Sequence, residues 1–437
     1  MRTQRRAFGA LSALVLGAAL PLLLGVGRGH VELVPIVFVH GGSGSGAQFE
    51  SQAMRFTSNG YPQSHLRVLE YDSSAIDAIL PEVHARLDAL IAELKAQTGA
   101  ARIDLMGHSL GTRVSHAYLA DPARAANVAR YVNIDGAQAD APPGGVPTLA
   151  LWAGTGAPGR QIAGATNVVI ENQSHVEVAT SEESFLEMYR FLRGRAPFTT
   201  RILPQILPRI SGRVTRFPQN EGFEGATLEV WRVKGRSGER IGRRPRHVFE
   251  IGPDGGFGPF RVVHGLHYEL TVRQPGEVDV HYFYEPFVRS DHLVRIQVAE
   301  ALGPFIEGGP NHTALTVIRY KEFWGDRGGE NDVLEIDGTD VVNPTVFATG
   351  SVGASSVAYF GFDVGSDGKS DLGAVPFPFG PLSFLTASDL YVPASPRRSV
   401  RVHVVPRGRL DEARTVNVPN LPSSASRVVV QLHDFEP

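Results

Sequence analysis

One five-residue segment, Gly107-His108-Ser109-Leu110-Gly111, constrains the fold of this chain more than any other feature. It follows an apolar run at residues 102–106, which is typical of a strand with an abrupt end. It precedes residues 112–119, which lack Gly and Pro and can form a helix. A Gly-x-Ser-x-Gly turn between a strand and a helix holds the serine hydroxyl clear of the sheet, with helix amides facing it. Ser109 is therefore our candidate nucleophile.

Length and composition restrict the class of protein. A chain of 437 residues exceeds what one compact core usually holds, so we expect more than one domain. The formal net charge of −3 gives no reason to expect nucleic-acid binding. Cysteine is absent, which excludes disulfides, thiol nucleophiles and cysteine metal sites.

Segments typical of strands and helices alternate between residues 34 and 198. Helical stretches occupy residues 81–95 and 181–192. This alternation predicts a mostly parallel sheet with helices on both faces, the α/β-hydrolase arrangement, as a catalytic domain over residues 34–198. The apolar runs typical of strands lie at residues 35–39, 66–71, 102–106, 130–134, 148–152 and 167–171.

The pattern changes after Arg195. Pro and Gly become frequent, and alternating runs at residues 227–233, 267–272 and 399–405 indicate strands. The one helical turn that the pattern allows lies at residues 292–301. We expect an all-β C-terminal region of one or two sandwich or barrel modules, one over residues 205–302 and one over 305–437, divided near Leu302-Gly303-Pro304.

The N-terminus, residues 1–30, carries the features of an export signal. Arg2, Arg5 and Arg6 precede an apolar run at residues 7–26. Arg5-Arg6-Ala7-Phe8 resembles the start of a twin-arginine signal, which predicts a periplasmic or extracellular protein. Gly25-Val26-Gly27 is a poor cleavage site, so retention of the segment as an N-terminal anchor is the alternative.

A serine nucleophile needs a base and a group that orients the base. In α/β-hydrolases the acid and then the histidine follow the serine along the chain. His175 follows the last predicted strand and precedes the final helix, whereas His116 lies in the helix of the serine turn itself. Asp135 closes the strand at residues 130–134, and no acid follows the next strand, so Asp135 is the predicted triad acid. Asp140, five residues on, is the alternative.

The oxyanion hole is expected at His40-Gly41-Gly42, a glycine-rich bend after the first strand. Its predicted donors are the backbone amides of Gly42 and Leu110. The glycine run at residues 41–46 lacks the following Lys-Ser/Thr of a phosphate-binding loop, so we reject that alternative.

These residues together resemble the two-domain archaeal long-chain lipases, in which an α/β-hydrolase precedes a β-rich domain. The resemblance implies hydrolysis of lipid esters, a triad acid at the position of Asp135, and a C-terminal domain that helps to engage lipid. The segments that carry it are Phe38-Val39-His40-Gly41, Gln48-Phe49-Glu50, Gly107-His108-Ser109, Ser174-His175-Val176, Pro286-Phe287-Val288-Arg289-Ser290, Val317-Ile318-Arg319-Tyr320-Lys321-Glu322-Phe323 and Asp367-Gly368-Lys369-Ser370-Asp371.

One departure concerns the lid. These lipases have a long lid insertion after the strand that corresponds to residues 66–71, but here about ten residues separate Tyr71 from the helix expected at Pro81. We therefore expect a permanently accessible site, no interfacial activation, and hydrolysis of short and medium esters at least as fast as of long ones.

Two features of the β region leave alternatives open. Asp363, Asp367 and Asp371 form an acidic loop that could bind Ca²⁺ through oxygens, or a solvated turn. A set of aromatic residues could face lipid or pack in the core. Its members are Phe283, Tyr284, Phe287, Phe323 and Trp324.

The function that we predict from the sequence is an exported serine ester hydrolase (lipase or esterase) that acts on fatty-acyl esters through an acyl-enzyme, without metal or organic cofactor. Its partners would be a lipid or another apolar ester, with contact to a lipid interface or membrane through the C-terminal β region. Hydrolysis of polyesters, thioesters or amides would use the same residues. The alternative of another class is a lipid- or polymer-binding protein with a vestigial hydrolase domain.

Overall fold

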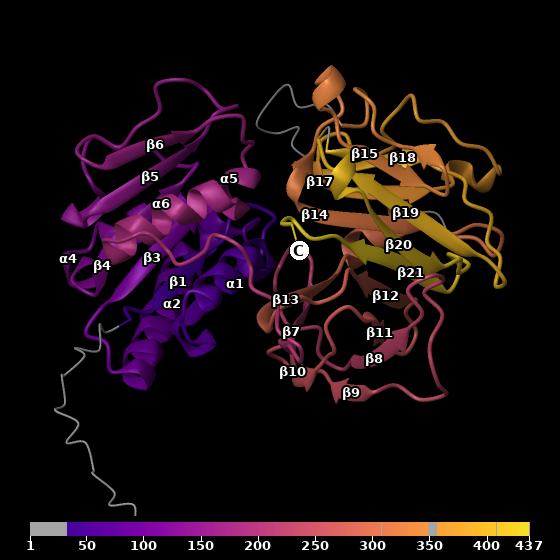
Figure 1. Ribbon diagram of the computed structural model, residues 1–437, viewed down its shortest axis with the longest axis horizontal. Helices are drawn as coiled ribbons and strands as arrows, with labels where there is room; N and C mark the ends of the chain where they lie inside the picture. Colours follow the sequence, from indigo (N-terminus) through magenta and orange to yellow (C-terminus); the bar gives the residue numbers. More distant parts are fainter. Residues whose placement is uncertain (1–32, 307, 348–355, 408, 437) are drawn as a thin grey trace, which may run out of the picture. The chain divides into compact units, whose positions relative to one another are not determined.

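The computed structural model describes residues 33–306, 308–347, 356–407 and 409–436 (Figure 1). The predicted export segment lies outside the described residues. None of the helices within the described ranges has the length and apolar character needed to cross a membrane.

The N-terminal part contains a six-stranded sheet in which every neighbouring pair is parallel, in the order β2-β1-β3-β4-β5-β6. This arrangement confirms the predicted fold class. Each expected strand is present, within a few residues of its predicted bounds. The strands are β1 Ile36–Val39, β2 Leu66–Leu69, β3 Ile103–His108, β4 Val128–Ile134, β5 Thr148–Ala153 and β6 Thr166–Ile170.

Helices cover both faces of this sheet because the strands are apolar on both sides. Ile36 and Phe38 of β1 pack with helices α1 (Glu50–Ser58) and α6 (Glu182–Arg193). The alternate residues, Val37 and Val39, pack on the other face with α2 (Ile76–Thr98) and α3 (Leu110–Leu119). The short helices α4 (Pro122–Ala125) and α5 (Glu177–Thr180) complete the set.

Helix α2 begins at Ile76, five residues before the predicted start at Pro81. The proline lies inside the helix, where it removes one backbone hydrogen bond without ending the helix. The connection from β2 is therefore even shorter than the sequence suggested. It leaves no room for a lid insertion at this position.

The C-terminal part is all-β, as predicted, and its described residues form three sheets. Their orders are β10-β7-β13, β18-β17-β14-β21-β12-β11-β8-β9 and β16-β15-β19-β20. The strands are β7 Arg209–Arg216, β8 Thr227–Val233, β9 His247–Glu250, β10 Gly256–Arg261, β11 His267–Arg273, β12 Asp279–Tyr284, β13 Asp291–Val298, β14 Leu315–Phe323, β15 Val333–Ile336, β16 Thr339–Asp340, β17 Ser356–Phe362, β18 Leu385–Asp389, β19 Ser399–Val405, β20 Arg414–Pro419 and β21 Ser426–Gln431.

The eight-stranded sheet joins the two expected modules. Strand β21, the last of the chain, pairs with β12 on one side and with β14 on the other, so one continuous sheet crosses the boundary near Leu302. One face of this sheet packs on the four-stranded sheet, and the other packs on the three-stranded sheet.

The helical turn expected at residues 292–301 is wrong. Residues Asp291–Val298 form strand β13, and a 3₁₀ helix follows at Glu300–Phe305. Leu293 packs in the core of the N-terminal sheet, whereas Val294 and Ile296 pack in the β core. Val294, Ile296 and Val298 keep the period of two of a strand, but Leu293, which packs on the other face, lies three residues from Ile296, a spacing that also suits a helix.

Candidate active site

Ser109 occupies a strained turn between β3 and α3, with φ of 53° and ψ of −122°. Two glycines make this turn sterically feasible. A Cβ on Gly111 would lie 2.2 Å from the carbonyl oxygen of Val39, and one on Gly107 would lie 2.7 Å from that of Gly111. A non-glycine residue with positive φ is uncommon and persists only where the surrounding packing enforces it.

The structure brings the three residues predicted for the triad together. The Nε2 atom of His175 lies 2.9 Å from the Oγ of Ser109, and its Nδ1 lies 2.5 Å from an oxygen of Asp135. His175 lies in the loop between β6 and α5, and Asp135 follows β4 directly. Asp140, the alternative acid, is exposed.

Asp135 is buried, yet it stays ionised. Burial opposes its charge, but the hydrogen bond and charge of His175, the backbone amide of Ala153 at 2.7 Å and the nearby Arg160 outweigh this and lower the pKa of Asp135. A guanidinium nitrogen of Arg160 lies 2.7 Å from the other carboxylate oxygen. Asp135 can thus hold one tautomer of His175 and stabilise the imidazolium.

Three residues around the triad were not identified from the sequence. They are Arg160, Gln48 and His108. The Nε2 of His108 lies 2.8 Å from the carbonyl oxygen of His175, and its Nδ1 lies 2.5 Å from the side-chain amide of Gln48. Burial and the neighbouring His175 lower the pKa of His108 to about 3, so its ring is neutral. A neutral ring that donates from Nε2 accepts at Nδ1, so the side-chain amide of Gln48 donates this bond. The sequence signals were the position of His108 inside the Gly-x-Ser-x-Gly motif and that of Gln48 in the segment Gln48-Phe49-Glu50.

The residues predicted for the oxyanion hole lie beside Ser109. A Cβ on Gly41 would lie 3.0 Å from the Cβ of Ser109, and one on Gly42 would lie 4.0 Å from the Leu110 side chain. Leu110 is the first residue of α3, so its amide has no partner inside the helix. The backbone at Gly41-Gly42 and the start of helix α3 at Leu110 therefore both lie close to Ser109. Gly41, Gly42 and Ser109 line a pocket of about 40 Å³.

Residues of the β region line the same pocket. Tyr320, Val357 and Phe384 contribute to it, and the ring of Phe384 stacks on that of His175 with centroids 6.0 Å apart. The lid insertion is absent, as the sequence suggested. Side chains more than 200 residues further along the chain line the pocket with Ser109, which is itself partly exposed, so the accessible site stays a prediction.

A larger cavity of about 520 Å³ continues from this pocket and shares Ser43, Tyr320, Val357 and Phe384 with it. It lies against one face of the eight-stranded sheet, where alternate residues of β14 line it. The cross-strand neighbours of these residues also face the cavity. They include Ala358 and Leu385 in the row of Ile318, and Phe360, Val429 and Tyr282 in the row of Thr316.

The depth of this cavity follows from the strand register. Arg427, which neighbours Val280, lies six residues below the level of Tyr320, or about 20 Å at 3.3 Å per residue. Gln274 and Glu277, in the turn between β11 and β12, add further polar groups to the lining near that far end. The cavity is therefore a long, largely apolar channel that adjoins the pocket of Ser109.

The two features of the β region that left alternatives open are the acidic loop at Asp363–Asp371 and the set of aromatic residues. Asp363 lies 3.1 Å from the Nδ1 of His312, and within the described ranges no group of three or more His, Asp or Glu side chains is placed to hold a metal. The aromatic residues weighed as a lipid-facing patch are all buried, which is the core alternative. They are Phe283, Tyr284, Phe287, Phe323 and Trp324.

Three family models match separate parts of this chain. Residues 33–121 match the family model described as lipase (class 2), and residues 208–301 match the lipase C-terminal domain. A third model, described as a C-terminal domain, matches residues 301–436. A comparison with curated proteins gave no significant match.

Similar solved structures include a predicted CIB-like hydrolase from Thermoplasma acidophilum, with 17% identity, a TM-score of 0.29, and coverage of 38% of this chain and 89% of that one. A gene product of Listeria innocua has 14% identity and a TM-score of 0.28, with coverage of 38% and 96%. The phospholipase PlaB from Legionella pneumophila has 8% identity and a TM-score of 0.23, with coverage of 92% and 93%.

Proposed function

We propose that this chain, a lipase-family hydrolase with a β-rich C-terminal region, cleaves fatty-acyl carboxylic esters with Ser109 as nucleophile. The observation that carries the proposal is the hydrogen-bonded series from Ser109 through His175 to Asp135, with spacings of 2.9 and 2.5 Å. Such a series activates a hydroxyl that is otherwise a weak nucleophile.

The reaction would proceed in two halves. His175 takes the proton of Ser109 as the Oγ attacks the ester carbonyl, and the amides of Gly42 and Leu110 donate to the oxyanion that forms. His175 then protonates the leaving alcohol, and the acyl group stays on Ser109. Water, deprotonated by His175, attacks the acyl-enzyme and releases the fatty acid.

The apolar cavity favours a fatty-acyl substrate over a small ester. Its lining is dominated by Val, Ile, Phe and Leu side chains, and its length suits an extended alkyl chain. This preference reverses the expectation drawn from the missing lid insertion. Thioesters and polyesters with an apolar acyl part would fit the same groups.

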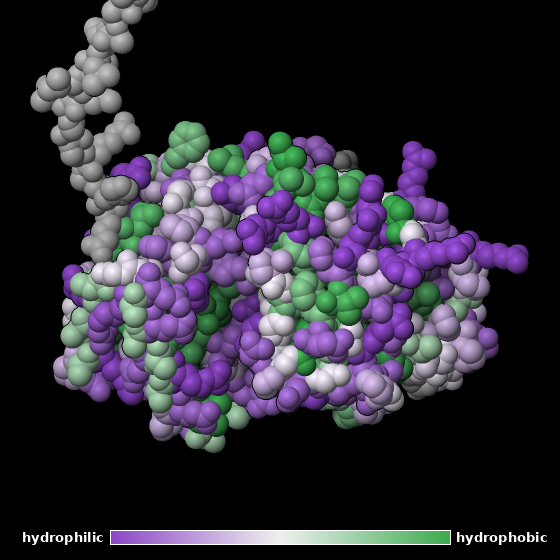
Figure 2. Space-filling view, turned by 90° about the horizontal axis from the view of Figure 1, so that it is seen from below, coloured by the Kyte–Doolittle hydropathy of each residue, from purple (hydrophilic) through white to green (hydrophobic). Residues whose placement is uncertain are grey.

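Contact with a lipid interface would involve a small patch of exposed apolar side chains. Phe377, which is 76% exposed, meets Phe305 edge-on with ring centroids 5.5 Å apart. Phe305 directly precedes Ile306, which lines the cavity. On the face drawn in Figure 2, apolar residues gather in patches between polar ones. We propose that the Phe305–Phe377 pair touches lipid beside the cavity.

The test uses a fluorophosphonate probe, which labels activated serines. We expect labelling of the wild-type protein at Ser109, and neither labelling nor turnover of p-nitrophenyl esters by Ser109→Ala. Labelling elsewhere, or ester turnover by folded Ser109→Ala, would overturn the mechanism. A protein with bound lipid but no labelling would support the vestigial-hydrolase alternative.

Export is a separate proposal that rests on the sequence of residues 1–30. N-terminal sequencing of protein from periplasmic and extracellular fractions would test it. It would also distinguish cleavage of the segment from its retention as an anchor.

A further inference from the structure

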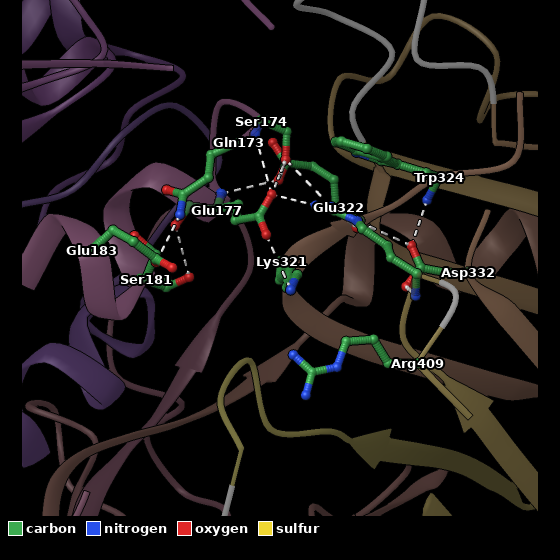
Figure 3. A network of polar contacts seen from close by, with 12 residues as sticks. Gln173, Ser174, Glu177, Ser181, Glu183, Lys321, Glu322, Trp324, Asp332 and Arg409 are labelled. Atoms are coloured by element: carbon green, nitrogen blue, oxygen red, sulfur yellow. Dashed lines mark hydrogen bonds and ion pairs between the residues drawn. The ribbon is translucent and has the colours of Figure 1, made fainter. Parts of the chain in front are cut away.

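The loop that carries His175 is held by a residue of the C-terminal β region. Three donors flank the histidine: the hydroxyl of Ser174 and the backbone amides of Val176 and Glu177. All three donate to the carboxylate of Glu322, with the two amides at 2.5 and 3.0 Å (Figure 3). The partners are separated by about 145 residues along the chain.

Glu322 is suited to this task because it is itself immobilised. It lies near the end of β14 and is fully buried, with an exposed fraction of 0%. Its backbone carbonyl accepts from Arg319 at 2.8 Å and from Arg407 at 2.7 Å. Arg319 in turn lies 2.9 Å from Asp332. The carboxylate is therefore fixed to a strand rather than to a mobile loop.

No cation pairs directly with this carboxylate among the described residues. Lys321 and Arg407, the nearby cations, pair with Glu177 instead. The buried charge of Glu322 is thus satisfied by the three donors of the histidine loop. A buried carboxylate without acceptable donors is costly, so the loop and the carboxylate hold each other in one arrangement.

The loop is held from the opposite side by the N-terminal domain. The Nε2 of His108 donates to the carbonyl oxygen of His175. The peptide unit between His175 and Val176 is therefore held at both ends, its carbonyl by His108 and its amide by Glu322. Such fixation is what keeps a catalytic base within reach of its nucleophile.

We propose that Glu322 is a positioning residue for His175, so that the C-terminal β region completes the catalytic apparatus and does not serve substrate binding alone. This inference rests on the proposed function, in which His175 is the base. All residues that the sequence predicted for the triad and the oxyanion hole, by contrast, precede Arg195.

The test compares kcat and KM of Glu322 variants on p-nitrophenyl butyrate. Glu322→Ala leaves three donors without an acceptor, and we expect kcat to fall by about 100-fold with KM changed less than twofold, because loss of alignment slows the chemical step. Glu322→Gln keeps one acceptor oxygen, and we expect an intermediate loss of about tenfold.

A matched control separates positioning from general damage. Glu269 is also a buried carboxylate of the eight-stranded sheet, but its partners are Arg240, Thr271 and His281, outside the site. Glu269→Gln should leave kcat within twofold of wild type even if it lowers the melting temperature.

A double-mutant cycle supplies the second measurement. Ser174→Ala removes one of the three donors, so its loss in kcat should be several-fold and should not add to that of Glu322→Gln. The inference fails if folded Glu322→Gln keeps wild-type kcat, if the two losses multiply, or if Glu269→Gln loses as much kcat. In each of those cases inactive Ser109→Ala would leave the proposed function standing, whereas active Ser109→Ala would remove both.

Discussion

Filling the cavity one row beyond Tyr320 should set a limit on acyl-chain length. Ala358 lies on β17 opposite Ile318, and its side chain shares the cavity face with Phe360. Ala358→Phe would place a ring across the channel while leaving the pocket at Ser109 unchanged. Short esters that do not reach this row should react as in the wild type.

The magnitude follows from the strand register. From the level of Ile318 to that of Arg427 the channel runs four residues, or about 13 Å. At about 1.25 Å per methylene this length holds about ten methylenes. Each buried methylene contributes about 0.8 kcal/mol, which is about fourfold in kcat/KM. For every four methylenes that the ring keeps out of the channel, the cost is therefore about 3 kcal/mol, or about 200-fold.

The assay is kcat/KM for p-nitrophenyl esters from butyrate to laurate, each below its aggregation limit. We expect the wild-type values to rise with chain length and the values of Ala358→Phe to level off. Tyr359→Phe is the control, because Tyr359 packs between the sheets on the opposite face of the same strand. Identical chain-length profiles, or an equal loss on butyrate, would show that the acyl chain does not enter this cavity.

Four further predictions follow from the site and its surroundings. Ser109→Ala and His175→Ala should each remove nearly all ester turnover, and their losses should not add. Asp135→Asn should lower kcat by on the order of 10⁴, whereas Asp140→Asn should do far less; steady-state kinetics of the folded variants would check this ranking. Phe377→Ser should weaken binding to neutral-lipid vesicles several-fold without changing butyrate turnover, and unchanged vesicle binding would exclude this surface. Burial raises the pKa of Asp434 to about 6, above its usual value, so the stability that the protonated carboxyl contributes is lost as pH rises from about 4 through 6. In thermal scans Asp434→Asn should therefore melt a few degrees above wild type at pH 8, and this difference in melting temperature should close near pH 4. An equal difference at both pH values would refute this linkage. A chain ending at Arg195 lacks Glu322 and should be inactive on soluble butyrate even if it folds by circular dichroism, whereas wild-type turnover by such a chain would contradict the role of the β region in catalysis.

Local sequence patterns were enough to predict the class of fold. Apolar runs with abrupt ends identified the six parallel strands, because a buried parallel strand needs apolar residues on both faces. The same strand ends identified Asp135 and His175, since side chains that follow parallel strands meet at one edge of the sheet. The structure brings these residues together with Ser109, and their catalytic roles remain our proposal.

The remaining features depend on contacts between distant segments, and no local period encodes them. Strand β13 was missed because Leu293 and Ile296, three residues apart, also suit a helix, and only the packing of Leu293 on the N-terminal domain and of Val294 and Ile296 on the β core fixes it as a strand. The cavity exists only because β12, β14, β17 and β21 align in one sheet, so that residues from 280 to 429 face the same space. In the sequence, nothing distinguishes Glu322 from the other charged residues of its strand, Arg319 and Lys321. Only the packing of β14 against the histidine loop turns it into the acceptor for Val176 and Glu177, because a buried carboxylate must find donors wherever the fold places it.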